Sequence, residues 1–463
     1  MTAEVVVHDD LDDELESLFQ QRQGEDGCEA RVPRAPDERR GAVLRLHALP
    51  DEVIMQVLQR ATAATVVCRC AQTGRKFRTL CASPSRLWRR LFRERWGEPE
   101  DCRGGEHPMS GAKPVWIHEP TSDRHTKDWK GAYSKWHTVD KNWRHGACSV
   151  NSLEGHVGSV CGCAITGDTL VSVGEDASIK WWDLDAMCCN FSLEKAHAGP
   201  IWSLKIDGEF LVTSSSDCTV KLWHCGKQSD GGNGQSDAPM QCERVLRGHR
   251  RGEVWCCDIT PDSIFSGGRD SVAKIWDRET GANYLSLESH TGSVFDIHAG
   301  CGPADAHSVL TCGGDGAAMF WDMRTGKPVL TMQGDREPIF TADVIDSHMV
   351  VTAGGDASAA RYDLRSGRKV LTFAGHSDSI WDLHFNSLSN RLVTTGCDTT
   401  VRIWDGWTGE DMASLQCHLE PVATVTCDAS RIVTGDYGGW LFIWDFNNNG
   451  STCEYVQLMG GVR

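Results

Sequence analysis

Three residue types that build a hydrolase triad recur together from residue 150 onward: a His, a Ser or Thr, and an Asp. In serine hydrolases the His activates the hydroxyl group and the Asp orients the His. The group returns seven times in this chain, at steps of 41 to 52 residues. A catalytic site is needed once, and no GxSxG nucleophile turn is present. The repetition therefore indicates a structural role, and we predict no catalytic residue and no enzyme.

The same four positions recur in every repeat, and an aromatic residue completes each set. Each Ser or Thr lies four residues before the Asp position, and each aromatic residue lies six residues after it. The four sets are His156, His197, His249, His290, Asp335, His376 and His418; Ser172, Thr213, Ser266, Thr311, Thr352, Thr394 and Thr434; Asp176, Asp217, Asp270, Asp315, Asp356, Asp398 and Gly438; and Trp182, Trp223, Trp276, Trp321, Tyr362, Trp404 and Trp444. Repeat 5 departs at Asp335 and Tyr362 and repeat 7 at Gly438, so we expect these two repeats to be the least rigid.

The elements that position these residues follow from a period of about 40 residues, which is typical of propellers. At "KWWD", "KIWD", "MFWD", "RIWD" and "FIWD" the sequence resembles the WD-repeat family. The resemblance implies a mainly β fold, a seven-bladed β-propeller of four-stranded blades over residues 148–459. Two segments compete to supply the outer strand of the last blade, residues 148–153 and residues 453–458.

A short helical pattern precedes the repeats. In "LPDEVIMQVLQ" a Pro stands near the first turn of a helix, and Val53, Ile54, Val57 and Leu58 form an apolar stripe. Together with "SRLWRRLF" this pattern resembles the F-box and predicts a small all-α module over residues 44–96. The resemblance implies binding to the adaptor of an SCF-type ubiquitin ligase and through it to the cullin scaffold. The predicted adaptor-binding residues are Leu49, Pro50, Ile54, Val57, Leu58 and Trp88. The alternative is a helical cap with no partner.

Charge and composition limit the partners. The 463 residues carry a formal net charge of −17. Residues 1–43 are acid-rich and are predicted to be a disordered tail, and an acidic body disfavours nucleic acid as a ligand. No apolar window approaches the length of a membrane span. The 21 Cys include no CxxC pair, so we predict no metal site and no cofactor. We expect an intracellular protein of the cytoplasm, the nucleus or both.

Residues 97–147 are predicted to be a partly helical connector. Trp129, Tyr133 and Trp136 recur at helical spacing, and "DKNWRHG" at residues 140–146 resembles the junction before the propeller in F-box/WD-repeat proteins.

The resemblance also implies where a target protein binds. In such propellers the second residue of each innermost strand and the residue before each Asp position face the ligand near the central channel. The predicted target-binding residues are Trp202, Trp255, Arg269, Phe295, Phe340, Trp381 and Tyr437. Because few Arg residues are present, we expect an apolar or cationic side chain in the channel mouth rather than a phosphate. The alternative is that the aromatic residues only pack the rim of the channel. The implied function is the substrate-recognition subunit of an SCF-type ubiquitin ligase; the alternative is a WD-repeat scaffold with no ligase role.

Overall fold

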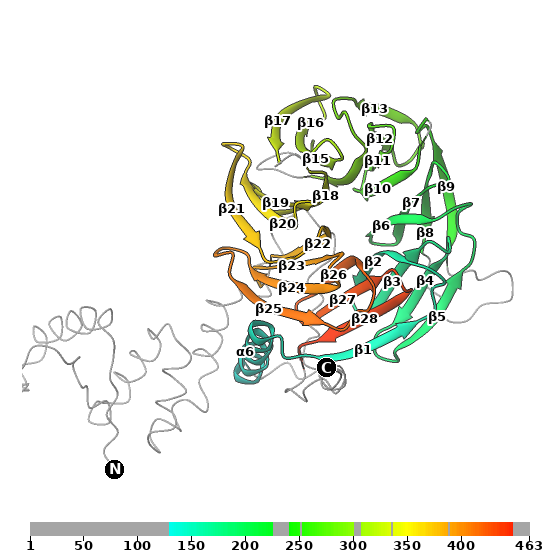
Figure 1. Cartoon of the computed structure of the whole chain (residues 1–463). Helices are drawn as coiled ribbons and strands as arrows, with labels where there is room; N and C mark the ends of the chain where they lie inside the picture. The colour runs from blue at the N-terminus through cyan, green and yellow to red at the C-terminus, as the bar shows by residue number, and fades with distance from the viewer. Residues whose placement is uncertain are drawn as a thin grey trace, which may run out of the picture. The chain divides into compact units, whose positions relative to one another are not determined.

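The computed structural model describes residues 129–225, 240–250, 252–300, 307–334, 337–387 and 389–447. The predicted acidic tail, the F-box-like module with its six adaptor-binding residues, and the first part of the connector lie outside the described residues. So do Asp335 and the competing segment 453–458. Within the described residues, 28 strands form seven four-stranded antiparallel sheets around a central axis, with one helix beside them (Figure 1). The predicted seven-bladed β-propeller is confirmed.

Each blade runs from an innermost strand at the central channel to an outer strand at the rim. The strands of blades 1 to 4 are β2 (Val160–Thr166), β3 (Thr169–Gly174), β4 (Ile179–Asp183), β5 (Cys188–Leu193); β6 (Ile201–Asp207), β7 (Phe210–Ser215), β8 (Thr219–His224), β9 (Gln241–Arg247); β10 (Val254–Ile259), β11 (Ser263–Gly268), β12 (Ala273–Asp277), β13 (Asn283–Leu287); and β14 (Val294–Ala299), β15 (Ser308–Gly313), β16 (Ala317–Asp322), β17 (Lys327–Gln333).

Blades 5 to 7 follow the same order, except that the outer strand of blade 7 comes from the start of the propeller. Their strands are β18 (Ile339–Asp346), β19 (Met349–Gly354), β20 (Ser358–Asp363), β21 (Arg368–Ala374); β22 (Ile380–Asn386), β23 (Arg391–Gly396), β24 (Thr400–Asp405), β25 (Asp411–Gln416); and β26 (Val422–Cys427), β27 (Arg431–Asp436), β28 (Trp440–Asp445), β1 (Ser149–Glu154).

The strand sequences follow from their burial. The second strand of each blade is covered on both faces by neighbouring blades, so it is a nearly continuous run of apolar and small residues, such as "MVVTAG" in β19. The outer strand is exposed on most of its length, and in β21 only Phe373 is buried. Burial between blades therefore supplies the core, and a single blade would have none of its own.

The N-terminal strand closes the ring. β1 pairs antiparallel with β28, in the register Val150 to Trp444 and Leu153 to Leu441. Of the two competing segments, residues 148–153 therefore supply the outer strand of blade 7. This closure joins the two ends of the propeller, because its first strand and its last strand belong to one sheet.

Helix α6 (Trp129–His145) ends against blades 6 and 7. The indole ring of Trp143, in the last turn of the helix, is fully buried and stacks on Phe446, with ring centroids 4.3 Å apart. Asn142 Nδ2 donates a hydrogen bond of 2.9 Å to the carbonyl of Phe446. Arg391 pairs with Asp140 and places its guanidinium 5.1 Å from the Trp143 ring centroid. Residues of the "DKNWRHG" segment thus hold the end of the helix on the propeller.

The helix stops with a Schellman motif. Gly146 has a φ of 61°, its N–H donates to the Trp143 carbonyl, and the Ala147 N–H donates to the Asn142 carbonyl. The left-handed residue turns the chain directly into β1. Among the described residues, no helix has both the length and the apolar character of a membrane span.

Candidate functional site

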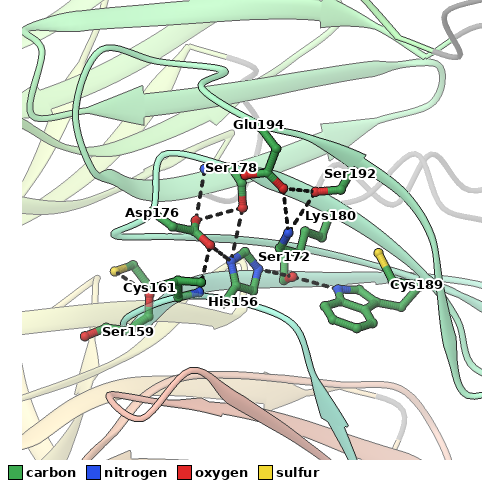
Figure 2. A network of polar contacts seen from close by, with 12 residues as sticks. His156, Ser159, Cys161, Ser172, Asp176, Ser178, Lys180, Cys189, Ser192 and Glu194 are labelled. Atoms are coloured by element: carbon green, nitrogen blue, oxygen red, sulfur yellow. Dashed lines mark hydrogen bonds and ion pairs between the residues drawn. The ribbon is translucent and has the colours of Figure 1, made fainter.

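A polar network fixes the loops on one side of six of the blades, and blade 1 shows it in detail (Figure 2). His156 Nδ1 donates to Asp176 over 2.9 Å, and Ser172 Oγ donates to His156 Nε2 over 2.7 Å. Trp182 Nε1 in turn donates to Ser172 Oγ over 2.8 Å. The Asp176 carboxylate also accepts the backbone N–H of Val157 at 3.0 Å. The network therefore ties the loop before the innermost strand to the turn between the second and third strands.

The chemistry of this network is structural. The Ser172 hydroxyl is fully buried and accepts the indole N–H, so no substrate reaches it. Burial raises the pKa of Asp176, but hydrogen bonds from His156 and Ser178 outweigh burial and hold this pKa well below its ordinary value. The carboxylate therefore stays ionised and orients the imidazole.

The same network recurs in blades 2, 3, 4 and 6, at the residues that the repeat pattern predicts. In blade 7 another carboxylate takes the place of the one that Gly438 lacks. His418 Nδ1 donates over 2.8 Å to Asp436, which lies two residues earlier at the end of β27 and is buried. In blade 5 Tyr362 is buried in the aromatic position, while Asp335 lies outside the described residues.

The loops and turns held by these networks form the upper face of the propeller, which includes residues 155–159 and 175–178 of blade 1 and their equivalents. The second residue of every innermost strand lies here, and each one is skipped in the pairing between the first and second strands of its blade. These seven residues are Cys161, Trp202, Trp255, Phe295, Phe340, Trp381 and Ala423. A bulge re-aims the residue that it leaves unpaired. The bulges thus free the predicted ring residues from the sheets.

Four of the five aromatic members of this ring form a row in which neighbouring rings are in contact. Trp202 lies 5.0 Å from Trp255, Trp255 lies 6.0 Å from Phe295, and Phe295 lies 5.4 Å from Phe340, all between ring centroids. The structure therefore brings four predicted target-binding residues from blades 2 to 5 into one arc. All four remain partly exposed.

Trp381 lies apart from this arc and pairs with the other side of the mouth. Its ring centroid is 4.8 Å from that of Tyr437 in blade 7. Burial, followed by the charges of Cys161 and Glu175, raises the pKa of Tyr437 to about 12. Tyr437 is thus a neutral phenol near an acidic side chain of blade 1.

Arg269, the one predicted basic residue, lies at the exposed rim of blade 3. Its guanidinium is 3.7 Å from the carboxylate of Glu253, and its side chain is 64% exposed. The neighbouring carboxylate offsets part of its charge, so the described part of this rim offers little excess positive charge to a phosphate.

Below the mouth, four aspartates join neighbouring blades, a feature that the repeat pattern did not reveal. Each accepts the N–H of its own next residue and an N–H from the innermost strand of the following blade. The bonds between blades run from Ala299 to Asp258 at 2.8 Å, from Ala342 to Asp296 at 3.0 Å, from Phe385 to Asp343 at 2.8 Å, and from Val425 to Asp382 at 2.8 Å. Blades 3 to 7 are therefore linked in series by partly buried carboxylates.

Lys205 of β6 supplies positive charge to this group. Burial lowers the pKa of Lys205, but the carboxylates, Asp258 and Asp296 foremost, raise it above its ordinary value. Burial also lowers the pKa of His298, and Asp296, 3.2 Å away, raises it to about 9. These groups therefore offset part of one another's charge in the channel.

Known family models match both the predicted helical segment before the propeller repeats and the repeats themselves. The F-box-like family model matches residues 46–94, and the WD domain, G-beta repeat model matches residues 147–183, 187–224, 240–277 and 367–405. The chain therefore combines an F-box-like segment with WD repeats. Both resemblances seen in the sequence are confirmed.

The curated relatives include a protein named as an SCF subunit and one named as an F-box/WD repeat protein. The probable E3 ubiquitin ligase complex SCF subunit sconB of Arthroderma benhamiae is 26% identical over 155 residues, which are 30% of this chain and 23% of the relative. The F-box/WD repeat-containing protein pof1 of Schizosaccharomyces pombe is 34% identical over 85 residues, 17% of this chain and 14% of the relative. The matches thus span less than a quarter of the length of either relative.

A solved structure matches the propeller. The WD40 β-propeller domain of Doa1 superposes with a TM-score of 0.54 at 21% identity, over 64% of this chain and 96% of that one. At this identity the similarity supports the fold alone.

Proposed function

We propose that this chain is the substrate-recognition subunit of an SCF-type ubiquitin ligase. The F-box-like segment binds the adaptor, which joins it to the cullin scaffold, and the upper face of the propeller binds the protein to be ubiquitinated. In this proposal the chain performs no bond chemistry itself. It raises the rate of transfer by holding a lysine of the target near the conjugating enzyme. This role places the protein in the cytoplasm, the nucleus or both.

One observation carries the proposal: an F-box-like match at residues 46–94 precedes a propeller whose upper face presents an arc of aromatic side chains. Aromatic side chains with partly exposed faces are frequent anchors of protein interfaces.

The attachment of α6 supports a role as a spacer. Its last turns are held to blades 6 and 7 by stacking, an ion pair and a backbone hydrogen bond. A receptor needs such a fixed attachment, because a target held on a loose tether reaches the reactive centre at a lower effective concentration.

The test is binding of the purified full chain to a recombinant SCF adaptor and cullin, measured by co-elution. A variant with Leu49→Ala, Pro50→Ala and Trp88→Ala removes predicted adaptor contacts, and a Trp202→Ala, Trp255→Ala variant is the matched control in the propeller. We expect co-elution for the wild type and the propeller variant and its loss in the first variant. A folded wild type that does not co-elute would contradict the proposal and leave a WD-repeat scaffold.

A further inference from the structure

An apolar patch is exposed on the upper face where blades 7 and 1 meet. It consists of Val157, Leu419, Tyr437 and Trp440, whose exposed fractions are 82%, 77%, 41% and 38%. Isolated apolar residues are common on surfaces, whereas a group of them marks a binding surface. The other large exposed apolar side chains of the described residues lie on outer strands or beyond the lower end of a blade.

Backbone contacts hold these four residues together. A Cβ atom added to Gly439, in the turn between Tyr437 and Trp440, would meet the carbonyl oxygens of His156 and Gly158 at 2.7 Å and 2.9 Å. The Tyr437 N–H donates over 3.0 Å to the carbonyl of Pro421, two residues after Leu419. The turn of blade 7 therefore lies between the two loops that carry Val157 and Leu419.

Two glutamates border the patch. The Glu175 side chain lies against Gly158, and its Oε2 would be 3.3 Å from a Cβ atom added to that glycine. The Glu420 side chain lies against Gly438, and its Cγ would be 3.6 Å from a Cβ atom added there. Both residues are exposed, and neither makes an ion pair within the described part of the chain. Both carboxylates are therefore available to a cation.

The charge of this side of the face has one sign. Asp378 of blade 6 adds a further exposed carboxylate, and segments 155–159, 175–177, 377–379, 419–421 and 437–440 contain no Lys or Arg. Of the exposed bases in the loops of this face, Arg250 and Arg269 belong to blade 3, and Lys195 lies in the connection from blade 1 to blade 2. An acidic border around an apolar centre is complementary to a ligand that combines positive charge with apolar side chains.

Deepening the proposed function, on which this inference rests, we propose that the patch of Val157, Leu419, Tyr437 and Trp440 binds an unmodified segment of the target in which large apolar residues stand beside Lys or Arg. The apolar side chains cover the patch and adjoin Trp381 through Tyr437. The basic side chains reach Glu175 and Glu420, and Tyr437 can also receive a cation on its ring face. A phosphorylated segment would be repelled by the same carboxylates.

The experiment selects short random peptides on the purified full chain by display. Selection is repeated on Leu419→Asp and on Glu175→Gln with Glu420→Gln, and on Val329→Asp as a matched control at an exposed apolar site of an outer strand. We expect enriched peptides to pair Leu, Phe or Trp with Lys or Arg. Their affinity should fall about tenfold or more in the patch variants, and it should be unchanged in Val329→Asp. The glutamate variant should also lose most of the salt dependence of binding.

Several outcomes would overturn the inference. These are no enrichment, enrichment of acidic peptides, equal binding to the patch variants, and tighter binding of a matched phosphoserine pool that depends on Arg250 and Arg269. The adaptor co-elution test on the same preparations separates this inference from the proposed function. Adaptor binding with no peptide selectivity contradicts the inference alone, and selectivity without adaptor binding contradicts the ligase role alone.

Discussion

His418 donates its Nδ1–H to Asp436 over 2.8 Å, although Asp436 lies two residues before the position at which the other repeats carry their carboxylate. The Asp436 backbone belongs to β27, whereas the other carboxylates belong to the turn after the second strand. Asp436 also accepts the N–H of Trp440 at 3.0 Å, so it anchors the turn that carries the apolar patch.

Replacing Asp436 should therefore weaken blade 7 as strongly as the equivalent change weakens a regular blade. We expect Asp436→Ala to lower the free energy of unfolding by about 2 to 4 kcal/mol, because it leaves the buried His418 without a partner. Chemical denaturation followed by Trp fluorescence measures the effect, with Asp398→Ala in blade 6 as the matched comparison. A near-neutral Asp436→Ala beside a destabilising Asp398→Ala would mean that blade 7 does not depend on this carboxylate.

Two buried histidines should respond to pH in opposite directions. Burial lowers the pKa of His197 more than Asp217 raises it, so its contribution is complete above about pH 6.5 and is lost as the pH falls. Asp296 raises the pKa of His298 to about 9, so its contribution is complete below pH 6.5 and is lost as the pH rises through 9.

The measurement is the difference in unfolding free energy between the wild type and His197→Gln or His298→Gln, at a series of pH values from 5 to 9.5. The difference should shrink toward low pH for His197→Gln and toward high pH for His298→Gln. For His298 the change across this range should approach about 3 kcal/mol. Parallel curves for the two variants would show that their charge states in the folded protein are not those assigned here.

The attachment of α6 should depend on a coupled pair. Asp140 and Arg391 form an ion pair in which the Arg391 side chain is 4% exposed. Replacing either residue by Ala should therefore leave the charge of the other uncompensated. In a double-mutant cycle with Asp140→Ala and Arg391→Ala we expect a coupling energy of about 1 to 3 kcal/mol. Arg144 is the control, because it reaches Asp140 at 3.4 Å but its side chain is 52% exposed. A coupling of Asp140 to Arg391 no larger than its coupling to Arg144 would contradict a buried attachment.

Lys205 should be needed to hold four carboxylates in the channel. We expect Lys205→Met to lower the free energy of unfolding by about 3 kcal/mol or more, because Asp258 and its neighbours lose their cation. Lys327→Met at an exposed site of β17 is the control and should change little. Adding Asp258→Asn to Lys205→Met should recover part of the loss. No recovery would indicate that the lysine acts through packing rather than charge.

The fold could be predicted because its determinants recur. A His, a hydroxyl residue, an Asp and a Trp at regular spacing mark every blade except two. The ring residues Trp202, Trp255 and Phe295 all occupy the second position of an innermost strand, so the repeat pattern predicts them together. These signals are local, so they can be recognised in a single sequence. The innermost strand has a bulge at each of these residues. The position of the residue in the repeat was sufficient to predict its role without knowledge of the bulge.

The remaining features join residues that no local pattern connects. The carboxylate bonds pair Asp258 with Ala299 and Asp343 with Phe385 across different repeats, at a strand position where the other blades carry Ala, Lys, His or Thr. Asp436 was missed because the count of six residues to the aromatic position fell on Gly438. The choice between two closing strands depended on long-range pairing, which periodicity does not encode.

Ubiquitin modification in cells shows whether one chain joins a bound target to the ligase. Proteins whose ubiquitination and turnover depend on the wild type are compared with those in cells carrying either the Leu49→Ala, Pro50→Ala, Trp88→Ala variant or a Trp255→Ala, Trp381→Ala variant. We expect a set of proteins that lose ubiquitin and accumulate with both variants, and that still bind the first variant but not the second. Unchanged ubiquitination and turnover with both folded variants would contradict it.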